Sequence, residues 1–369
     1  MSILNIALIG PGLVGSEFLS QLLAHQTRGA GPVLRVIAIA SSSRVVSSGN
    51  GVDLTSYKAL LASADVSPTD SVLESIGAVA TAYLPCTVVD CTSSDAVAAL
   101  YPAWLKAGVH VVTPNKKGFS GPMPLFNAIK EAQETGGKSG SRPIALHEAT
   151  VGAGLPIIST LNDLVETGDE IVKIEGILSG TLSYIFNNYS VAGGASGHKF
   201  SDIVNVAKEK GYTEPDPRDD LNGMDVGRKV TILGRVAGIP LNLETLPIEN
   251  IVPEPLRAVA SAEEFMKRLP EYDDHFAALN AAAAAKGRVL RCVGVVDPRE
   301  GSSVRLAEYD ASHPFASLKG SDNIIAFTTR QFPNPLIVQG AGAGAAVTAF
   351  GMFSDILKIA KRVGYASSL

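Results

Sequence analysis

The residue types best suited to acid–base chemistry lie in one block, Gly211–Lys229. Before a predicted helix, two prolines stiffen the chain and one of two aspartates can cap the helix: Pro215, Pro217, Asp219 and Asp220. Inside that helix, Asp225 and Lys229 stand four residues apart and therefore share one face. A carboxylate and an ammonium are thereby within hydrogen-bonding reach, which is typical of an active-site loop that enters a helix.

An exposed helical ion pair is the alternative interpretation, and such a pair contributes only about 0.3–0.5 kcal/mol. The glycines of the same helix favour an active site. Gly223, Gly227 and Gly234 gather on another face, and each costs up to about 1 kcal/mol of helix propensity. Glycines at that cost predict close packing against a neighbour, so we expect the ion pair to face a cleft.

The N-terminal segment predicts a nucleotide-binding unit. A strand at Ile3–Ile9 is followed by a G-x-G-x-x-G turn and by a helix over Ser16–His25. In this pattern the first glycine makes the turn, the second admits a pyrophosphate and the third lets helix and strand pack closely, while the helix start favours the phosphate charge. The candidate cofactor contacts in this turn are Gly10, Gly12, Leu13, Val14 and Gly15.

The end of the second predicted strand, Leu34–Ala40, bears on the choice between NAD and NADP. An acidic residue usually stands there to hold the ribose hydroxyls, and none does in this chain. Ser42, Ser43 and Arg44 follow instead, and hydroxyls beside a guanidinium suit a 2′-phosphate. We therefore expect NADP(H) to be preferred, with NAD(H) possible. The alternative is a solvated serine loop.

Continued alternation of strands and helices predicts an α/β fold with a Rossmann-type, doubly wound parallel sheet. The further segments are Thr87–Cys91, Ala96–Ala107, His110–Thr113, Pro122–Thr135 and Ile144–His147. Such sheets bind ligands just beyond the carboxyl ends of their strands. The candidate contacts at these positions are Thr92, Ser93, Asn115 and Lys116.

From about Glu148 the pattern changes and predicts a second, α+β domain with a mixed or antiparallel sheet. Its predicted strands include Ile171–Leu178, Arg288–Val296, Val304–Tyr309 and Asn323–Phe332. Gly340–Gly344 then opens a helix to Arg362 that returns to the first domain, and Gly342 is a further candidate cofactor contact. We expect a dinucleotide-binding domain of residues 1–148 with 341–369, and a substrate-binding and dimerisation domain of residues 149–340.

Composition argues against several classes of partner. The chain is 46% hydrophobic and 18% charged, with a net charge of −5 and no basic stripe, so neither a nucleic acid nor an anionic membrane is expected. No apolar run approaches the roughly 20 residues that span a bilayer, and no charged leader precedes the first strand, so we expect a cytoplasmic protein. The three cysteines have no metal-ligand spacing, and Cys91 is interpreted as a small buried thiol rather than a nucleophile.

With these features assembled, the chain resembles the homoserine dehydrogenases, in particular the short fungal type without a fused kinase. Besides the glycine turn and the C-terminal Gly-Ala repeat, the motifs that carry the resemblance are Thr113–Lys117, His147–Pro156, Gly176–Thr181 and Gly211–Lys229. The resemblance spans essentially the whole chain. It implies NAD(P)H-dependent reduction of aspartate β-semialdehyde to homoserine, on the route to threonine, isoleucine and methionine.

The resemblance also implies roles for single residues. Lys229 is the proton donor to the aldehyde oxygen and Asp225 orients it. This agrees with the chemistry, because hydride transfer to the aldehyde carbon leaves negative charge on oxygen, which an ammonium can stabilise and protonate. Lys116 is a competing donor that could instead reach the nicotinamide or the substrate carboxylate. The residues implied to bind the amino acid are Glu214, Asp220, Gly180 and Thr181.

The family pattern further implies a structural site for a monovalent cation, Na⁺ or K⁺, at Glu148 and the backbone carbonyls of Val151, Ala153 and Leu155. A hard cation with oxygen ligands is physically reasonable there. The alternative is a loop that uses glycine only for unusual dihedral angles. The resemblance and the apolar strands of the second domain together favour a homodimer.

Two other functions remain open at this point. An enzyme similar to aspartate-semialdehyde dehydrogenase would need a Cys–His pair for acyl-enzyme chemistry, and Cys292 lies in an apolar strand without suitable neighbours. A non-catalytic NADP-sensing protein would keep the fold and not need the carboxylates and lysine of Gly211–Lys229.

Overall fold

The computed structural model describes residues 3–29, 31–137, 142–195 and 197–364. Contacts divide the chain into two compact units, Met1–Gly154 with Gly344–Leu369 and Leu155–Ala343. We call them the nucleotide unit and the catalytic unit, after their expected roles. The boundaries thus fall at residues 154 and 344, where the sequence suggested 148 and 341. No helix among the described residues is long and apolar enough to cross a membrane.

The nucleotide unit contains a six-stranded sheet in the order β3-β2-β1-β4-β5-β6. The strands are β1 (Ile3–Ile9), β2 (Val33–Ala40), β3 (Val45–Ser47), β4 (Cys86–Asp90), β5 (His110–Val112) and β6 (Ala145–Leu146). All neighbours pair in parallel except β2 with β3. The chain moves outward from β1 through β2 and then resumes on the other side at β4. This reversal makes the β1–β4 edge the topological switch point, where ligands bind in such sheets.

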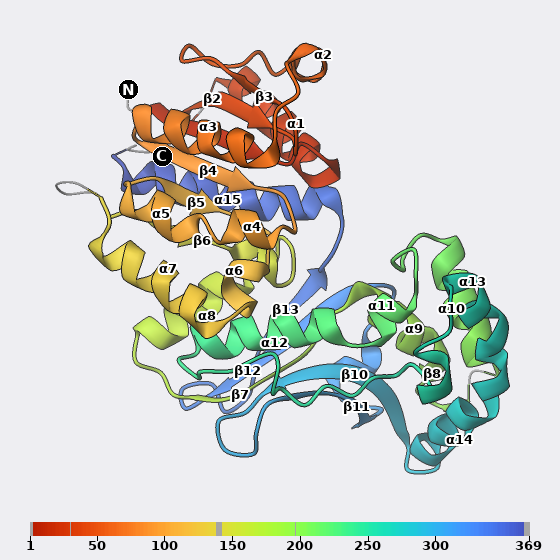
Figure 1. The fold of residues 1–369 in the computed structure, drawn as a ribbon. Coiled ribbons are helices and arrows are strands. Elements are labelled where there is room, and N and C mark those ends of the chain that lie inside the picture. The colour runs from red at the N-terminus through yellow and green to blue at the C-terminus, as the bar shows by residue number, and fades with distance from the viewer. Residues whose placement is uncertain (1–2, 30, 138–141, 196, 365–369) are drawn as a thin grey trace. The chain divides into compact units, whose positions relative to one another are not determined.

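Helices cover both faces of this sheet, as predicted for a doubly wound fold (Figure 1). They are α1 (Leu13–Arg28), α2 (Tyr57–Ser63), α3 (Thr69–Ala82), α4 (Asp95–Ala98), α5 (Tyr101–Lys106), α6 (Lys117–Ser120), α7 (Met123–Thr135), η1 (Glu148–Thr150) and α15 (Ala345–Arg362). The prediction of a single helix over Ala96–Ala107 is wrong. The segment forms two helices, α4 and α5, because Pro102 lacks the N–H that would continue the first helix.

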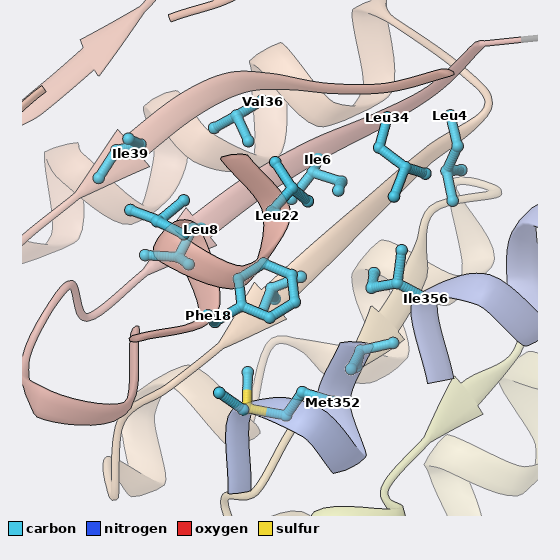
Figure 2. Packing of buried hydrophobic residues seen from close by; sticks show 14 of the residues in the cluster. Leu4, Ile6, Leu8, Phe18, Leu22, Leu34, Val36, Ile39, Met352 and Ile356 are labelled. Atoms are coloured by element: carbon cyan, nitrogen blue, oxygen red, sulfur yellow. The ribbon is translucent and has the colours of Figure 1, made fainter. Parts of the chain in front are cut away.

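The C-terminal helix α15 completes the core of the nucleotide unit. Figure 2 shows Ile6 and Leu8 of β1 packed with Phe18 of α1 and with Met352 and Ile356 of α15. Each of these five residues is 0% exposed. The last helix therefore completes the core of the sheet that the first strand begins.

The catalytic unit is built on a five-stranded sheet, and every pairing in it is antiparallel. The order is β11-β10-β7-β12-β13, formed by β7 (Ile171–Ile177), β10 (Arg288–Val296), β11 (Ser303–Asp310), β12 (Asp322–Thr329) and β13 (Leu336–Ala341). A short ribbon pairs β8 (Ser190–Val191) with β9 (Gly194–Ala195). The sequence missed β13: Gly340 and Ala341 end this strand, and α15 begins only at Ala345.

Helices gather on the sheet of the catalytic unit. They are α8 (Ile157–Glu166), α9 (Gly180–Tyr189), α10 (Phe200–Glu209), α11 (Arg218–Leu221), α12 (Met224–Val236), α13 (Ala262–Arg268) and α14 (Asp273–Ala284), with the short 3₁₀ turns η2 (Glu254–Leu256), η3 (Leu269–Tyr272) and η4 (Pro314–Ser317). Helix α12 lies directly on β10, where a Cβ at Gly294 would come within 2.5 Å of Val230 Cγ2. This close contact fixes the helix that carries the candidate ion pair.

Candidate active site and cofactor site

The block Gly211–Lys229 forms a loop, the single turn α11 and the start of α12. Gly223 joins the two helices in the left-handed region, at φ 76°. The expected cap by Asp219 or Asp220 is wrong, because both lie inside α11, and Asp216 Oδ1 instead accepts the backbone N–H of Arg218, the first residue of that helix, at 3.0 Å. Asn222 likewise accepts the backbone N–H of Met224 at the start of α12, at 2.8 Å.

Lys229 is buried, at 8% exposure, and its ammonium contacts a carboxylate and a backbone carbonyl. Nζ lies 2.7 Å from Asp225 Oδ2 and donates to the carbonyl oxygen of Leu178, also at 2.7 Å. The Asp225 side chain remains 46% exposed. The structure therefore brings together the two predicted catalytic residues and adds Leu178, which sequence spacing could not indicate because it follows β7, far away in the chain.

The glycines of α12 allow the close packing that the sequence predicts. A Cβ at Gly227 would lie 2.4 Å from Ile248 Cδ1, and one at Gly234 would lie 2.3 Å from Leu241 Cδ1. The segment that follows α12 thus packs against the glycine face of the helix. This contact excludes the interpretation of α12 as a loosely packed surface helix.

A hydrogen-bonded clamp lies beside this helix. The Thr181 hydroxyl lies 2.8 Å from Asp220 Oδ1 and 2.6 Å from the carbonyl oxygen of Tyr212, and the backbone N–H of Glu214 donates to Asp220 Oδ2 at 2.8 Å. Burial raises the pKa of Asp220, and the negative charges of Glu214 and Asp225 add to that effect, although the two hydrogen bonds oppose it. Both Asp220 oxygens are thus engaged within the protein, while the Glu214 side chain is exposed.

Gly180 opens α9 in the same unit, next to the Gly-Ala segment that ends β13. A Cβ at Gly180 would lie 3.2 Å from the Ser321 carbonyl oxygen and 3.7 Å from Ala343 Cβ. Gly342 leaves even less room, since its Cβ would lie 2.1 Å from the Asn323 side chain. Gly180 and the segment that contains Gly342 are therefore neighbours, although they lie far apart in the sequence.

The glycine turn of the nucleotide unit has the predicted geometry. Gly10 has φ 85°, and a Cβ at Gly15 would lie 2.3 Å from the Gly10 carbonyl oxygen. A Cβ at Gly12, by contrast, would meet nothing within 4 Å. Helix α1 starts at Leu13, which is 81% exposed, with Val14 partly buried behind it. The protein itself thus requires glycine at Gly10 and Gly15, whereas Gly12 leaves open space at the helix start.

A pocket of about 490 Å³ lies between the glycine turn and the end of β2. It is lined by Pro11, Ser16, Ser41, Arg44, Tyr57, Lys58, Leu61 and Ala62. The Arg44 guanidinium also bonds to the carbonyl oxygen of Ala62. The predicted Ser42 and Ser43 do not line the pocket: the Ser42 carbonyl accepts from Thr69, at 2.8 Å, and the Ser43 N–H donates to Ser41 Oγ, at 3.3 Å.

The second cation of this pocket, Lys58, was not predicted. Lys58 belongs to α2, a helix that no motif marks, and it reaches the wall of the pocket through the fold alone. Tyr57 and Ser16, whose hydroxyls lie 3.0 Å apart, complete the wall.

The other cofactor candidates follow β4 and β5. A Cβ at Gly10 would lie 3.0 Å from Thr92 Cγ2, so the loop with Thr92 and Ser93 runs beside the glycine turn. The Asn115 side chain is 3% exposed and bonds only to atoms of the nucleotide unit, so a cofactor contact there would use its backbone. Lys116 is partly buried and belongs to the nucleotide unit, whereas Lys229 belongs to the catalytic unit.

The proposed cation loop has unusual backbone angles. Gly152 and Ala153 have φ of 75° and 53°, and Ala153 is the one non-glycine residue with positive φ in the described chain. Glu148, 4% exposed, lies 3.2 Å from Lys358 Nζ, and its N–H donates to Asp355 Oδ2 at 2.9 Å. No group of three or more His, Cys, Asp or Glu side chains in the described parts could hold a metal, so such a site would depend on carbonyl oxygens.

The cysteines do not support acyl-enzyme chemistry. Burial raises the pKa of Cys86 and of Cys292 to about 12. Desolvation and, to a lesser extent, the Asp90 carboxylate raise the pKa of Cys91, which is only partly buried. A thiol with a raised pKa is a poor nucleophile near neutrality.

Comparisons with known proteins fit this geometry. Residues 156–357 match the homoserine dehydrogenase family, and residues 10–140 match the NAD binding domain of homoserine dehydrogenase. The chain belongs to the homoserine dehydrogenase family. This confirms the predicted resemblance and the enzyme class, an NAD(P)-dependent oxidoreductase with homoserine dehydrogenase activity.

Individual relatives agree over nearly their full lengths. The homoserine dehydrogenase of Saccharomyces cerevisiae is 46% identical, covering 98% of this chain and 99% of the relative. That of Schizosaccharomyces pombe is 46% identical over 97% and 96% of the two chains. The structure of a hyperthermophilic archaeal homoserine dehydrogenase in complex with NADPH superposes with a TM-score of 0.70, at 25% identity and 97% coverage of each chain.

Proposed function

We propose that Lys229 donates the proton to the aldehyde oxygen of L-aspartate 4-semialdehyde, with Asp225 as its orienting partner. The observation that carries this role is the buried ammonium held between Asp225 Oδ2 and the Leu178 carbonyl, at 2.7 Å each. The reduced nicotinamide supplies the hydride. The ammonium stabilises the charge that develops on oxygen and neutralises it by proton transfer.

The loop before α11 is proposed to bind the amino acid end of the substrate. Glu214 offers an exposed carboxylate to the substrate ammonium, while Asp220, whose oxygens accept from Thr181 and from the Glu214 backbone, holds that loop. Gly180 opens the helix N-terminus of α9 to the substrate carboxylate, and Lys116 is a further candidate for that group. Glu214→Gln should raise KM for homoserine well above its effect on KM for NADP. Equal changes in both constants would contradict the assignment.

NADP is proposed as the preferred cofactor. Arg44 and Lys58 place two cations on the wall of one pocket, and Ser41 adds a hydroxyl. A 2′-phosphate is dianionic near neutral pH, so two cations discriminate strongly against the ribose hydroxyl of NAD. The residues fit the group, and they would hold it by charge-assisted hydrogen bonds.

A monovalent cation at Glu148, Val151, Ala153 and Leu155 is also proposed. The left-handed pair Gly152–Ala153 turns successive carbonyl groups in different directions, as a loop around a cation requires. Because Lys358 already neutralises part of the Glu148 charge, the site would hold a singly charged ion more readily than a divalent one. Thermal unfolding in KCl, NaCl and tetramethylammonium chloride at equal ionic strength tests this, and equal Tm in all three would contradict it.

A cytoplasmic homodimer, formed through the catalytic unit, is the proposed assembly. Its antiparallel sheet carries partly exposed apolar side chains such as Ile337, at 40% exposure, and twofold dimers are the commonest way to cover such a sheet. Light scattering of an active preparation at micromolar concentration should return twice the chain mass. A monomer mass would overturn this assembly.

Loss of NADPH absorbance with aspartate semialdehyde, measured with and without phosphate, tests the activity as a whole. Homoserine dehydrogenase oxidises NADPH without phosphate. An enzyme of the aspartate-semialdehyde dehydrogenase type would instead reduce NADP only when phosphate or arsenate is present, and a sensor protein would show neither reaction.

A further inference from the structure

A buried carboxylate lies at the switch point of the nucleotide unit. Asp90 is the last residue of β4 and has 0% exposure. Three donors converge on it: the Thr92 N–H on Oδ1 at 2.8 Å, and the Asn115 amide, at 2.9 Å, and the Tyr101 hydroxyl on Oδ2. All three are neutral, and two of them come from the loops that follow β4 and β5. The carboxylate therefore bonds to both loops at once.

The Asn115 side chain extends this connection. Its amide nitrogen also donates to the Ser94 carbonyl at 3.0 Å, and its amide oxygen accepts the N–H of Lys117 at 3.1 Å. The Thr113 hydroxyl lies 2.8 Å from the Asp90 carbonyl oxygen and accepts the Asn115 N–H at 2.8 Å. Every polar group of the Asn115 amide is used, so Lys116 is held between two fixed neighbours.

We propose that Asp90 is a positioning residue for cofactor binding, which fixes the loop Thr92–Ser94 against the loop Asn115–Lys117. Asp90 touches no ligand, because it is fully buried. It acts through the backbone of Thr92 beside the glycine turn and through Asn115 next to Lys116. This inference rests on the proposed contacts of those two loops with the cofactor and the substrate.

The network requires an acceptor-only side chain at position 90. An ionised carboxylate accepts all three donors, whereas an amide of the same shape must direct its NH₂ group at one of them. The Tyr101 hydroxyl can rotate and accept, but the Thr92 N–H and the Asn115 NH₂ cannot. Asp90→Asn should therefore lose its bond to Thr92 or its bond to Asn115, and either loss breaks the connection between the two loops.

The test compares Asp90→Asn with two variants in the intact protein. Tyr101→Phe removes the one donor that belongs to neither loop. Thr87→Val is the matched control on β4, since the Thr87 hydroxyl is fully buried and has no hydrogen-bond partner in the described chain. Readouts are the Kd of NADPH from fluorescence titration, both KM values, kcat and Tm.

Asp90→Asn should raise the Kd of NADPH by about tenfold to a hundredfold, which is about the factor that a hydrogen bond to a charged group contributes. Tyr101→Phe should raise this Kd by no more than about threefold, even if its Tm falls as far as that of Asp90→Asn, and Thr87→Val should match the unmodified protein. A purely structural role would lower Tm in Asp90→Asn and leave the Kd unchanged well below that temperature. That result, or an equal Kd increase in Tyr101→Phe, would overturn the proposal.

Failure of the proposed Lys116 contact can be distinguished from failure of the positioning role of Asp90. Lys116→Ala would then leave both KM values unchanged, while Asp90→Asn still raises the Kd of NADPH through the Thr92 loop. If Lys116→Ala raises KM but Asp90→Asn binds NADPH normally, the positioning role alone is wrong.

Discussion

The two units prepare their ligand sites by different means. In the nucleotide unit the glycine turn works through backbone, because Gly15 lets α1 approach Gly10 and the open start of α1 offers N–H groups to a phosphate. In the catalytic unit the chemistry belongs to side chains, since Lys229 and Asp225 stand on one turn of α12. A backbone site is damaged by adding atoms, whereas a side-chain site is damaged by removing them.

The contrast extends to how each site is held. Gly15 is constrained mainly within one strand–turn–helix segment, by the Gly10 carbonyl, whereas Gly10 also lies against Cys91 and Thr92 after β4. Lys229 is constrained by the Leu178 carbonyl, and α12 is pressed onto β10 at Gly294 and onto Ile248 at Gly227. The catalytic site therefore depends on contacts that are distant in the chain, so substitutions in either unit should have distinct signatures.

The largest expected effect is in the catalytic unit. Lys229→Ala should lower kcat by about a thousandfold, the middle of the range for a positioned general acid, while the Kd of NADPH changes less than about twofold. Lys286→Ala, which removes an exposed ion pair with Glu308, is the control and should be active. Steady-state kinetics with fluorescence titration measure both constants. A loss of only a few-fold would assign the proton to Lys116 or to water.

Adding a methyl group to the glycine turn should distinguish positions that affect stability from positions that affect only NADPH binding. Gly15→Ala must displace the Gly10 carbonyl, 2.3 Å from the new Cβ, and should cost about 1–3 kcal/mol of stability as well as NADPH affinity. Gly12→Ala meets no atom within 4 Å and should weaken NADPH binding at unchanged Tm. Calorimetry beside titration tests both. Normal NADPH binding by Gly12→Ala would remove the proposed phosphate from this turn.

Cofactor choice tests whether side chains also contribute in the nucleotide unit. Arg44→Ala should cost about 1.5–3 kcal/mol of NADP binding, the range for a hydrogen bond to a charged group, and should hardly affect NAD. Lys58→Ala should act in the same direction, since both cations line one pocket. Titration with both cofactors provides the measurement. Equal use of NAD and NADP by the unmodified protein would defeat the assignment.

The smallest expected effect is the dependence of the free energy of unfolding on pH. His110 is 2% exposed and its Nδ1 accepts the Ile144 N–H at 3.1 Å; burial and, less, the charge of Arg362 lower its pKa to about 4. The unfolded chain then binds the proton first, so stability is retained above about pH 6.5 and lost as pH falls towards 4. The loss should be about 1.4 kcal/mol at pH 5.5.

His110→Asn keeps an acceptor for the Ile144 N–H and removes the titrating ring. Urea unfolding of both proteins between pH 7 and 5 therefore isolates the contribution of this histidine. Parallel curves would show that His110 does not control the acid response of the nucleotide unit.

Much of the nucleotide unit follows from sequence, because its signals are local. The strand Ile3–Ile9, the glycine turn and the helix after it are adjacent residues, and their spacing alone predicts the βα unit that the structure contains. The break at Pro102 shows that prediction has limits even in this unit. A single helix was predicted across the proline, although its missing N–H interrupts the helix.

The ion pair of the catalytic unit was also predictable, because residues four apart on a helix must be neighbours. Its environment was not. The Leu178 carbonyl reaches Lys229 across 51 positions, Thr181 reaches Asp220 across 39, and Lys58 joins Arg44 through a pocket wall. Such contacts arise when sheets and helices bury their apolar faces, and burial is a property of the whole fold. The sequence by itself determined which groups could do the chemistry; only the tertiary structure decided which oxygens and cations they meet.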